Sequence, residues 1–475
     1  MQARTTIPVG PPISKPLPSY WQDPKSPLAN LVEPEADSGT QPYEYAIIGS
    51  GITGTMIAYN ILKRRPNSRV VMLEAREVCS GATGRNGGHT KAASYRSYVQ
   101  NVEVLGKEEA LRIARLEYVN IVETHEMARE LGIQCESEFC RTVDVIYGWG
   151  VFEEGKRAIE ALRADAKEEE RAEGKMAWYQ IHEPTDEALE KFHVARTNTN
   201  SEIDDKEDVA GFFEYMAGRI HAYRFTTGIL KECVKKGLQI MTNTPVHALQ
   251  PSQTTPASWH VYTQFNTITA QHVILATNGY TPYLLKETQS AIVPMRGQIT
   301  AQRAGPNSKL PSPLTTTYSF IYKGGYEYMI PRNTSAGQDL IIGGGLGVLG
   351  ATTPSEYGTV NDGSLNPKIS SYLLESLAGY FGASNWGEDT PSERVVQEWS
   401  GIMGATADGR PFVGEVPGKK GVWVCAGFNG HGMVLCAKSA EAVVGMVVGE
   451  GRLEWFPESF LVGGGRFRRG GEGGM

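Results

Sequence analysis

Apolar runs separated by a short glycine-rich turn open the main body of the chain. Tyr43–Ile48 is apolar enough to predict a buried strand, and 52–65 places apolar or small residues at helical spacing until Pro66 ends the helix. Val70–Leu73 predicts a second buried strand, which ends at Glu74. These segments form one strand-turn-helix-strand unit.

The rest of the chain contains both helical and extended patterns. Helices are predicted at 101–133, 153–175, 209–236, Pro367–Phe381 and 433–448. Strands are predicted at 240–249, 259–265, 268–276 and Val422–Ala426. Residues 290–345 alternate apolar and polar positions around Gly and Pro, which favours a mostly antiparallel sheet.

Composition narrows the class of protein. The 475 residues fit two or three domains, with 40% hydrophobic and 21% charged residues as in globular chains. The net charge of −7 argues against a nucleic-acid-binding protein, which needs a basic surface. Six scattered cysteines, with no CxxC or HExxH spacing, favour buried thiols over disulfides or a metal site.

The chain ends predict no targeting signal. There is no apolar segment typical of a secretory signal, and no run reaches the ~20 apolar residues of a membrane span. We therefore expect a soluble, cytoplasmic protein that binds neither nucleic acid nor membrane. Residues 1–42 predict an extended arm that packs through Tyr20, Trp21 and Leu28, and 463–475 predicts a disordered Gly- and Arg-rich tail.

The turn at 49–54 matches the pattern G-x-G-x-x-G between the first strand and the first helix. Gly49 permits the tight turn, Gly51 lets the backbone approach a pyrophosphate, and Gly54 lets helix and strand pack closely. The helix N-terminus offers N–H groups to the phosphates. Glu74 can accept hydrogen bonds from ribose hydroxyls, so the unit predicts a dinucleotide site.

A second loop of small residues, 79–89, follows Glu74 almost directly and reads Cys-Ser-Gly-Ala-Thr-Gly-Arg-Asn-Gly-Gly-His. An NAD domain usually continues into another helix and strand, whereas such a loop can close over a longer cofactor. Arg85 could offset phosphate charge, and the glycines could expose N–H groups to a flavin. The alternative is a flexible surface loop.

With these two loops, four later patterns resemble one family. They are Ala-Thr-Asn-Gly at 276–279, Pro-Met-Arg-Gly-Gln at 294–298, Trp-Ser-Gly at 399–401 through Thr-Ala-Asp-Gly-Arg-Pro at 406–411, and Gly-Phe-Asn-Gly-His-Gly at 427–432. Over roughly 43–455 the chain resembles the D-amino-acid-oxidase-type FAD-dependent oxidoreductases (glycine/sarcosine oxidase-like). It is most similar to their γ-glutamylputrescine oxidase-like branch.

The resemblance implies an α/β (α+β) fold, in which a Rossmann-like FAD-binding domain is interleaved with a substrate domain built on a mostly antiparallel sheet. We expect the FAD-binding domain to comprise three segments, 43–100, 206–285 and 393–462. The substrate domain is expected to comprise the helical segment 101–205 and the segment 286–392. The arm at 1–42 and the tail at 463–475 lie outside both domains.

The implied cofactor is FAD, held without a covalent bond. Covalent members use Cys or His, but Gly401 stands near the position of that Cys, and their His lies nearer Arg85 than His89 does. His89 is the residue most able to overturn this expectation. The expected FAD-binding residues are Gly49, Ser50, Gly51, Ile52, Thr53, Gly54, Glu74, Ala75, Arg76, Ser80, Thr83, Gly84, Arg85, Asn86, Gly87, Gly88, Val246 (on the adenine side), Thr277, Asn278, Gly401, Gly427, Asn429, Gly430, His431, Gly432 and Met433.

Three residues are candidates for catalysis. Arg296 is expected near the flavin face, where it could attract an anionic substrate group or help stabilise superoxide; the alternative is a surface or strand-pairing arginine. His431 could add a donor or a positive charge at the start of the last helix, or simply be packed. Lys91 lies near the place where sarcosine oxidases hold the substrate carboxylate.

By resemblance, the chemistry is the flavin's. A small amine or amino-acid-like substrate gives a hydride from its α-carbon to flavin N5, and O2 or another electron acceptor then re-oxidises the flavin, with O2 giving H2O2. The alternative is a tailoring oxidoreductase that acts on an alcohol, a polyol or a secondary-metabolite intermediate. The sequence leaves the substrate, the physiological acceptor and the oligomeric state open.

Overall fold

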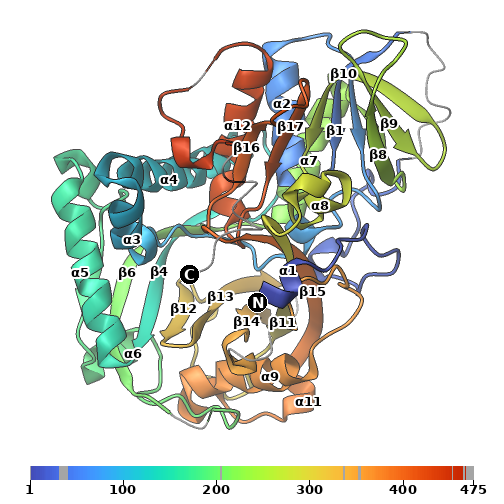
Figure 1. Ribbon diagram of the computed structural model, residues 1–475. Coiled ribbons are helices and arrows are strands. Elements are labelled where there is room, and N and C mark those ends of the chain that lie inside the picture. Colours follow the sequence, from blue (N-terminus) through green and yellow to red (C-terminus); the bar gives the residue numbers. More distant parts are fainter. Residues whose placement is uncertain are drawn as a thin grey trace.

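Two β-sheets form the framework of the protein. The computed structural model describes residues 2–31, 41–203, 206–334, 337–350, 355–451, 453–463 and 466. The first sheet lies in the upper half of Figure 1, and the second lies below it. This combination of helices and two sheets confirms the predicted α/β (α+β) class.

The first sheet has eight strands, five of which run parallel in the order β17-β10-β1-β2-β7. Alternate side chains enter two apolar cores: Ile47 and Met72 face one core, and Ala46 and Val71 face the other. Burial on both faces explains why these strands are apolar at nearly every position. The strands are β1 (Tyr43–Ile48), β2 (Val70–Leu73), β7 (Gln239–Met241), β8 (Val246–Pro251), β9 (Trp259–Thr263), β10 (Thr267–Leu275), β16 (Phe412–Glu415) and β17 (Val422–Ala426).

Three helices cover one face of this sheet: α2 (Ile52–Arg64), α7 (Ala222–Lys235) and α12 (Gly432–Val447). Their apolar side chains share a core with Ile47 and Met72. The N-termini of α2 and α12 both follow the carboxyl end of a parallel strand, which is where α/β sheets bind ligands.

The second sheet has nine strands in the order β15-β11-β14-β13-β12-β4-β6-β3, with β5 paired to β6. Strands β11 to β14 pair antiparallel, which confirms the expectation for 290–345, while β12 pairs in parallel with β4. The strands are β3 (His89–Thr90), β4 (Glu138–Tyr147), β5 (Gln180–His182), β6 (Val209–Arg219), β11 (Ile292–Gln302), β12 (Thr317–Tyr322), β13 (Gly325–Thr334), β14 (Gly337–Gly344) and β15 (Val395–Thr406).

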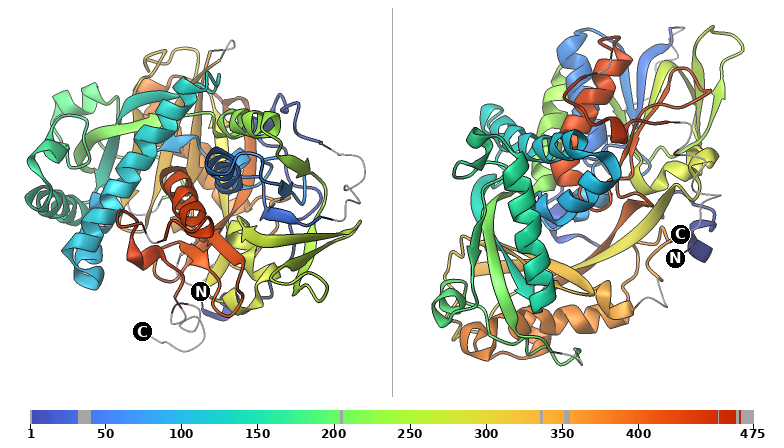
Figure 2. Two further views of the ribbon diagram at one scale, coloured as in Figure 1. Left: turned by 90° about the horizontal axis from the view of Figure 1, so that it is seen from above. Right: turned by 60° about the vertical axis from the view of Figure 1, so that its left-hand side comes forward.

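Helices lie on both faces of the second sheet. The orange helix α9 (Pro367–Phe381) runs beneath it in Figure 1 and in the right-hand view of Figure 2. The other face packs against α3 (Tyr95–Leu105), α4 (Lys107–Glu130) and α5 (Trp149–Asp165). The short helices are α1 (Gln2–Thr5), α6 (Asp186–Lys191), α8 (Thr281–Leu284), α10 (Ala383–Trp386) and α11 (Pro391–Arg394).

The predicted helix at 209–236 is wrong in its first half, because Val209–Arg219 is strand β6. Its side chains alternate between two cores: Phe212 packs on the α9 side and Phe213 on the α3–α5 side. An apolar run that is buried on both faces has no polar positions from which to read its period. The expected strand at 240–249 is likewise two strands, β7 and β8.

The N-terminal arm, described over residues 2–31, packs on the body as expected. Trp21 is buried, Tyr20 stacks on Trp399 with ring centroids 5.9 Å apart, and Leu28 packs against the core below α2. The expected tail at 463–475 lies outside the described residues except for Gly463 and Arg466.

Candidate functional site

A long cavity lies between the two sheets and has about 1510 Å³ of empty space, including its open mouth. Its wall comes from the turns after β1, β2 and β17, the second loop, the start of β8, and strands β11, β13 and β15. The expected FAD-binding residues that line it are Gly49, Ser50, Gly51, Ile52, Thr53, Glu74, Ala75, Arg76, Thr83, Arg85, Asn86, Val246, Thr277, Asn278, Gly401, Gly430, Gly432 and Met433.

Each glycine of the first turn is required for a different structural reason. Gly49 has a φ of 106°, and a Cβ there would lie 2.7 Å from the Ala276 carbonyl oxygen. A Cβ on Gly54 would lie 1.9 Å from the Gly49 carbonyl oxygen, so Gly54 lets α2 contact β1. Gly51 lines the cavity, and its Cβ would meet only Thr83, at 3.2 Å. Gly51 is therefore the glycine whose side chain would obstruct the cavity.

Glu74 lies at the carboxyl end of β2 and fastens two segments. Its Oε2 accepts from the Ser50 amide (3.0 Å) and hydroxyl (2.6 Å), and its Oε1 accepts from the Arg76 amide at 3.0 Å. A carboxylate has lone pairs beyond these three bonds, and Glu74 lines the cavity. It can therefore accept ribose hydroxyls while it holds the turn.

The second loop is bonded to the first turn. Its 3₁₀ segment, η2 (Ala82–Arg85), places the Thr83 hydroxyl 3.0 Å from the Ile52 amide at the start of α2. The Cys79 amide donates to the Ser50 hydroxyl at 2.9 Å. The two loops therefore form one wall of the cavity.

Arg85 lines the cavity, but its guanidinium is committed elsewhere. It donates to the carbonyl oxygens of Ser80 (2.8 Å), Leu17 (2.7 Å) and Ser400 (3.0 Å). Arg85 therefore joins the loop to the arm and to β15, and the expectation that its charge offsets phosphate charge stays a prediction.

The last glycine turn is shaped by two asparagines. Asn278 Oδ1 accepts from the amides of Gly427 (3.0 Å) and Phe428 (3.2 Å). Asn429 Oδ1 accepts from the Thr406 amide at 2.7 Å. Asn429 and Gly427 thus belong to the turn behind the cavity wall. The expected FAD-binding residues that do not line this cavity are Gly54, Ser80, Gly84, Gly87, Gly88, Gly427, Asn429 and His431.

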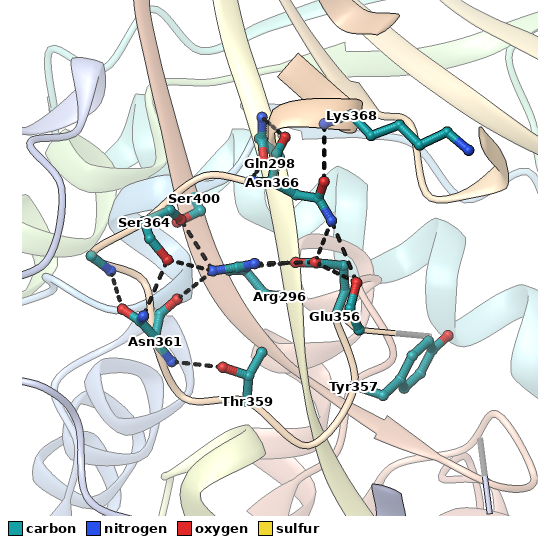
Figure 3. A network of polar contacts seen from close by, with 12 residues as sticks. Arg296, Gln298, Glu356, Tyr357, Thr359, Asn361, Ser364, Asn366, Lys368 and Ser400 are labelled. Atoms are coloured by element: carbon teal, nitrogen blue, oxygen red, sulfur yellow. Dashed lines mark hydrogen bonds and ion pairs between the residues drawn. The ribbon is translucent and has the colours of Figure 1, made fainter. Parts of the chain in front are cut away.

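Arg296 lines neither of the two cavities of the site, which corrects the expectation that it lies near the flavin face. On β11, Gly297 and Ile299 line the cavity, so the alternation of the strand directs Arg296 to the opposite face. There it pairs with Glu356 (2.5 and 3.1 Å) and donates to Ser364 Oγ at 2.7 Å and to the Asn361 carbonyl at 3.2 Å, as Figure 3 shows.

A second cavity of about 620 Å³, including its mouth, opens beside the first. Asn86, Tyr328, Gly430 and Met433 line both cavities, so the two adjoin. The other lining residues are Gly87, His89, Lys91, Ala92, Ala93, Arg96, Ser319, Tyr326, His431 and Val434. The described lining contains no Asp or Glu.

Lys91 is buried in this second cavity. Its ammonium pairs with Asp144 and donates to Ser319 Oγ at 2.8 Å. Asp144 also accepts from the hydroxyls of Tyr95 (2.7 Å) and Tyr215 (3.0 Å). Burial lowers the pKa of Lys91, and the Asp144 carboxylate opposes that shift. Lys91 is therefore already bound to a carboxylate of the protein.

Both histidines of the second cavity are held in place and neutral. His89 Nε2 lies 2.8 Å from Thr317 Oγ1, and burial lowers its pKa well below 6.5. His431 Nδ1 lies 2.9 Å from the Asn429 carbonyl, and burial lowers its pKa as well. At neutral pH, each can offer a hydrogen bond without adding charge.

Arg96, at the start of α3, was missed by sequence reasoning. Its guanidinium lies 4.2 Å above the Tyr326 ring and lines the second cavity. Within the residues that the structure describes, no carboxylate pairs with this guanidinium and no hydrogen bond engages it. No motif marks this position, because its exposure to the cavity depends on how α3 packs.

Other cavity residues were also missed. Pro11 and Pro12 of the arm, Tyr280 and Tyr283 after β10, and Tyr328 on β13 line the first cavity. The proline pair lies in the arm, outside the 43–455 range over which the sequence patterns resemble the family, so no pattern connected it with the site.

The residues fit a bound FAD. The cavity is long, two helix N-termini reach it, and Glu74 stands at one parallel strand end. Gly401 lines it where β15 packs closely on the second loop, since a Cβ there would lie 3.0 Å from Arg85 Cβ. Among the described residues, no His/Cys/Asp/Glu group could hold a metal ion, and no helix is long and apolar enough to cross a bilayer.

Comparisons with known proteins agree with this geometry. Residues 44–446 match the family model described as FAD dependent oxidoreductase. A probable oxidoreductase OrdL from Rhizobium meliloti (strain 1021) is 24% identical over 94% of this chain and 96% of its own. The crystal structure of glycine oxidase from Geobacillus kaustophilus superimposes with a TM-score of 0.68 at 20% identity, covering 90% of this chain and 99% of that one. That of L-proline dehydrogenase from P. horikoshii gives 0.65 at 18%, covering 90% and 98%.

Proposed function

Because the chain belongs to the FAD-dependent oxidoreductase family, with FAD as its cofactor, we propose that it oxidises a small amino-acid-like amine that carries an anionic group. In this proposal the first cavity would hold FAD, and the adjoining second cavity would receive the substrate. When bound, FAD would supply the acceptor for the hydride of the substrate α-carbon, and O2, which would be reduced to H2O2, is the proposed final electron acceptor.

One observation supports an anionic substrate: the second cavity contains a guanidinium without a carboxylate partner among the described residues. Arg96 is free to bind a carboxylate with two parallel N–H···O bonds. The described lining offers no carboxylate to a second ammonium group, which a diamine would bring. The cavity thus favours amino-acid-like substrates over diamines.

The neutral imidazoles support oxidation of an amine. A substrate amine must be unprotonated when its α-carbon loses a hydride, and a lining without anions disfavours the ammonium form. Burial keeps His89 and His431 uncharged, so they can accept a hydrogen bond from an N–H group. The two superimposed relatives are named for activity on glycine and on L-proline, which accords with this proposal.

Anaerobic reduction of the bound flavin tests the proposal. Amino acids, N-substituted amino acids, diamines and polyols are mixed with the holoprotein, and loss of flavin absorbance is followed. We expect reduction by an amine with a carboxylate. If polyols alone bleach the flavin, the alternative reaction on an alcohol is supported and the proposal fails.

Arg96→Gln should weaken the carboxylate contact by about 1.5–3 kcal/mol, which raises the apparent Kd for the reducing substrate roughly 10- to 150-fold. Arg157→Gln is the matched control, because Arg157 is exposed on α5 and lines neither cavity. Equal behaviour of the two variants would rule out Arg96 as the anion site.

A further inference from the structure

A buried carboxylate, Asp362, lies where three segments meet. Its side chain is about 1% exposed, and both oxygens accept from Arg76 Nη1 at 3.0 Å. Arg85 Nε lies 3.5 Å from its Oδ2. Both arginines line the cofactor cavity, so one carboxylate neutralises two cations in its wall.

The same three residues hold the N-terminal arm, and Arg76 Nη1 donates to the Ile13 carbonyl at 3.4 Å. The Leu17 amide donates to the Asp362 carbonyl at 2.9 Å, and Arg85 donates to the Leu17 carbonyl at 2.7 Å. Nearby, the Ser19 hydroxyl donates to the Gly84 carbonyl at 2.7 Å. Because these bonds follow Pro11 and Pro12 closely in sequence, they fix the stretch of the arm that lines the cavity.

The loop that carries Asp362 is held from its other side. This loop, residues 355–366, is bonded to Arg296 through Glu356 and Ser364, and Asn366 Nδ2 donates to Glu356 Oε1 at 2.8 Å (Figure 3). The Ser400 hydroxyl donates to the Ser364 carbonyl at 3.0 Å. Arg296 therefore determines where Asp362 lies without touching the cavity.

We propose that Asp362 is a positioning residue for the cofactor site: it locks Arg76 and Arg85 in the cavity wall and thereby fastens the arm as a strap that must detach before FAD leaves. Removing the carboxylate leaves two buried cations without their counter-ion, which loosens both arginines and the arm bonded to them. The alternative is that the ion pairs of Asp362 stabilise the fold but have no selective effect on FAD release.

The test compares the release of FAD from holoproteins. Asp362→Asn and a deletion of residues 2–19 are each diluted below the dissociation constant, and the rise of free-flavin fluorescence gives the release rate. We expect each change to accelerate release about tenfold or more, because loosening the wall around a bound ligand acts mainly on its dissociation rate. The double variant should release FAD little faster than either single variant, because both changes loosen the same stretch of the arm.

The matched control is Asp389→Asn. Asp389 is likewise the partner of a buried arginine, Arg394, with two contacts of 2.8 Å; its own side chain is 9% exposed, and neither residue lines a cavity. Its release rate should stay within about twofold of wild type. Release at the wild-type rate from Asp362→Asn or from the deletion, or equal acceleration by Asp389→Asn, would overturn the proposal.

Hydrogen exchange gives a readout that a mere loss of stability would not produce. In Asp362→Asn the amides of 13–22 should exchange faster while those of β1 stay protected. Should that variant fail to fold, Arg296→Gln releases the same loop from outside the cavity and must give both faster exchange in 13–22 and faster FAD release. If Arg296→Gln leaves the exchange rates of 13–22 and the rate of FAD release unchanged, the proposal that the arm acts as a strap is refuted.

Discussion

Replacing Gly51 by leucine should remove FAD and spare the fold. Gly51 has a φ of −67° and a ψ of −179°, which any residue adopts, and a Cβ there would meet only Thr83, at 3.2 Å from its hydroxyl. As the N-cap of α2, Gly51 tolerates an apolar residue at a cost of about 1 kcal/mol. The rest of the leucine side chain would enter the cavity where the pyrophosphate is expected.

The loss of affinity can be bounded. A pyrophosphate that cannot approach the turn loses charge-assisted hydrogen bonds worth about 1.5–3 kcal/mol each. Two such bonds amount to roughly 3–6 kcal/mol, or about two to four decades in Kd. Purified Gly51→Leu should therefore be colourless, as measured by the ratio of flavin to protein absorbance.

Gly54→Ala is the contrasting variant. Its Cβ would lie 1.9 Å from the Gly49 carbonyl oxygen, against an ordinary C···O contact of about 3.3 Å, so α2 must move by about 1.4 Å. Such overpacking lowers the free energy of unfolding by about 1–3 kcal/mol even without FAD. Urea unfolding of both apoproteins distinguishes a variant that only loses FAD (Gly51→Leu) from one whose fold is destabilised (Gly54→Ala). Normal FAD content in Gly51→Leu, or a destabilisation equal to that of Gly54→Ala, would refute the placement of the pyrophosphate.

Two further predictions concern the flavin linkage and a buried acid. Acid precipitation of the yellow protein should leave FAD in the supernatant, whereas colour in the pellet would reveal a covalent bond and point to His89. Burial raises the pKa of Glu117 to about 7, so its proton is held more tightly when folded and stability falls as pH rises from about 4.5 to 7. Glu117→Gln should abolish this loss. The free energy of unfolding of the variant relative to wild type should therefore rise by up to about 3 kcal/mol between pH 4 and pH 8, as measured by urea unfolding; parallel pH profiles for the two proteins would contradict it.

The features of the site that could be predicted from sequence are those encoded by consecutive residues. The turn at 49–54 and the carboxylate of Glu74 depend on backbone conformations that glycine or a strand end imposes locally, and the structure places them in the cavity wall. The position of Arg296 could not be predicted this way. The strand around it was expected correctly, but which face meets the cavity depends on pairing with β14 and β15.

Which residue binds the substrate anion depends on whether a cation already has a counter-ion in the protein. No sequence pattern contains that distinction. Arg76, Arg85, Arg296 and Lys91 each have a carboxylate of the protein within ion-pair distance. At any of them an anionic substrate would compete with a carboxylate partner of the protein, and breaking a buried pair of this kind costs about 3–5 kcal/mol. Arg96 has an aromatic ring below it and the cavity beside it, so it can bind a carboxylate without that cost. Among these five cations, we therefore expect the substrate anion to select Arg96.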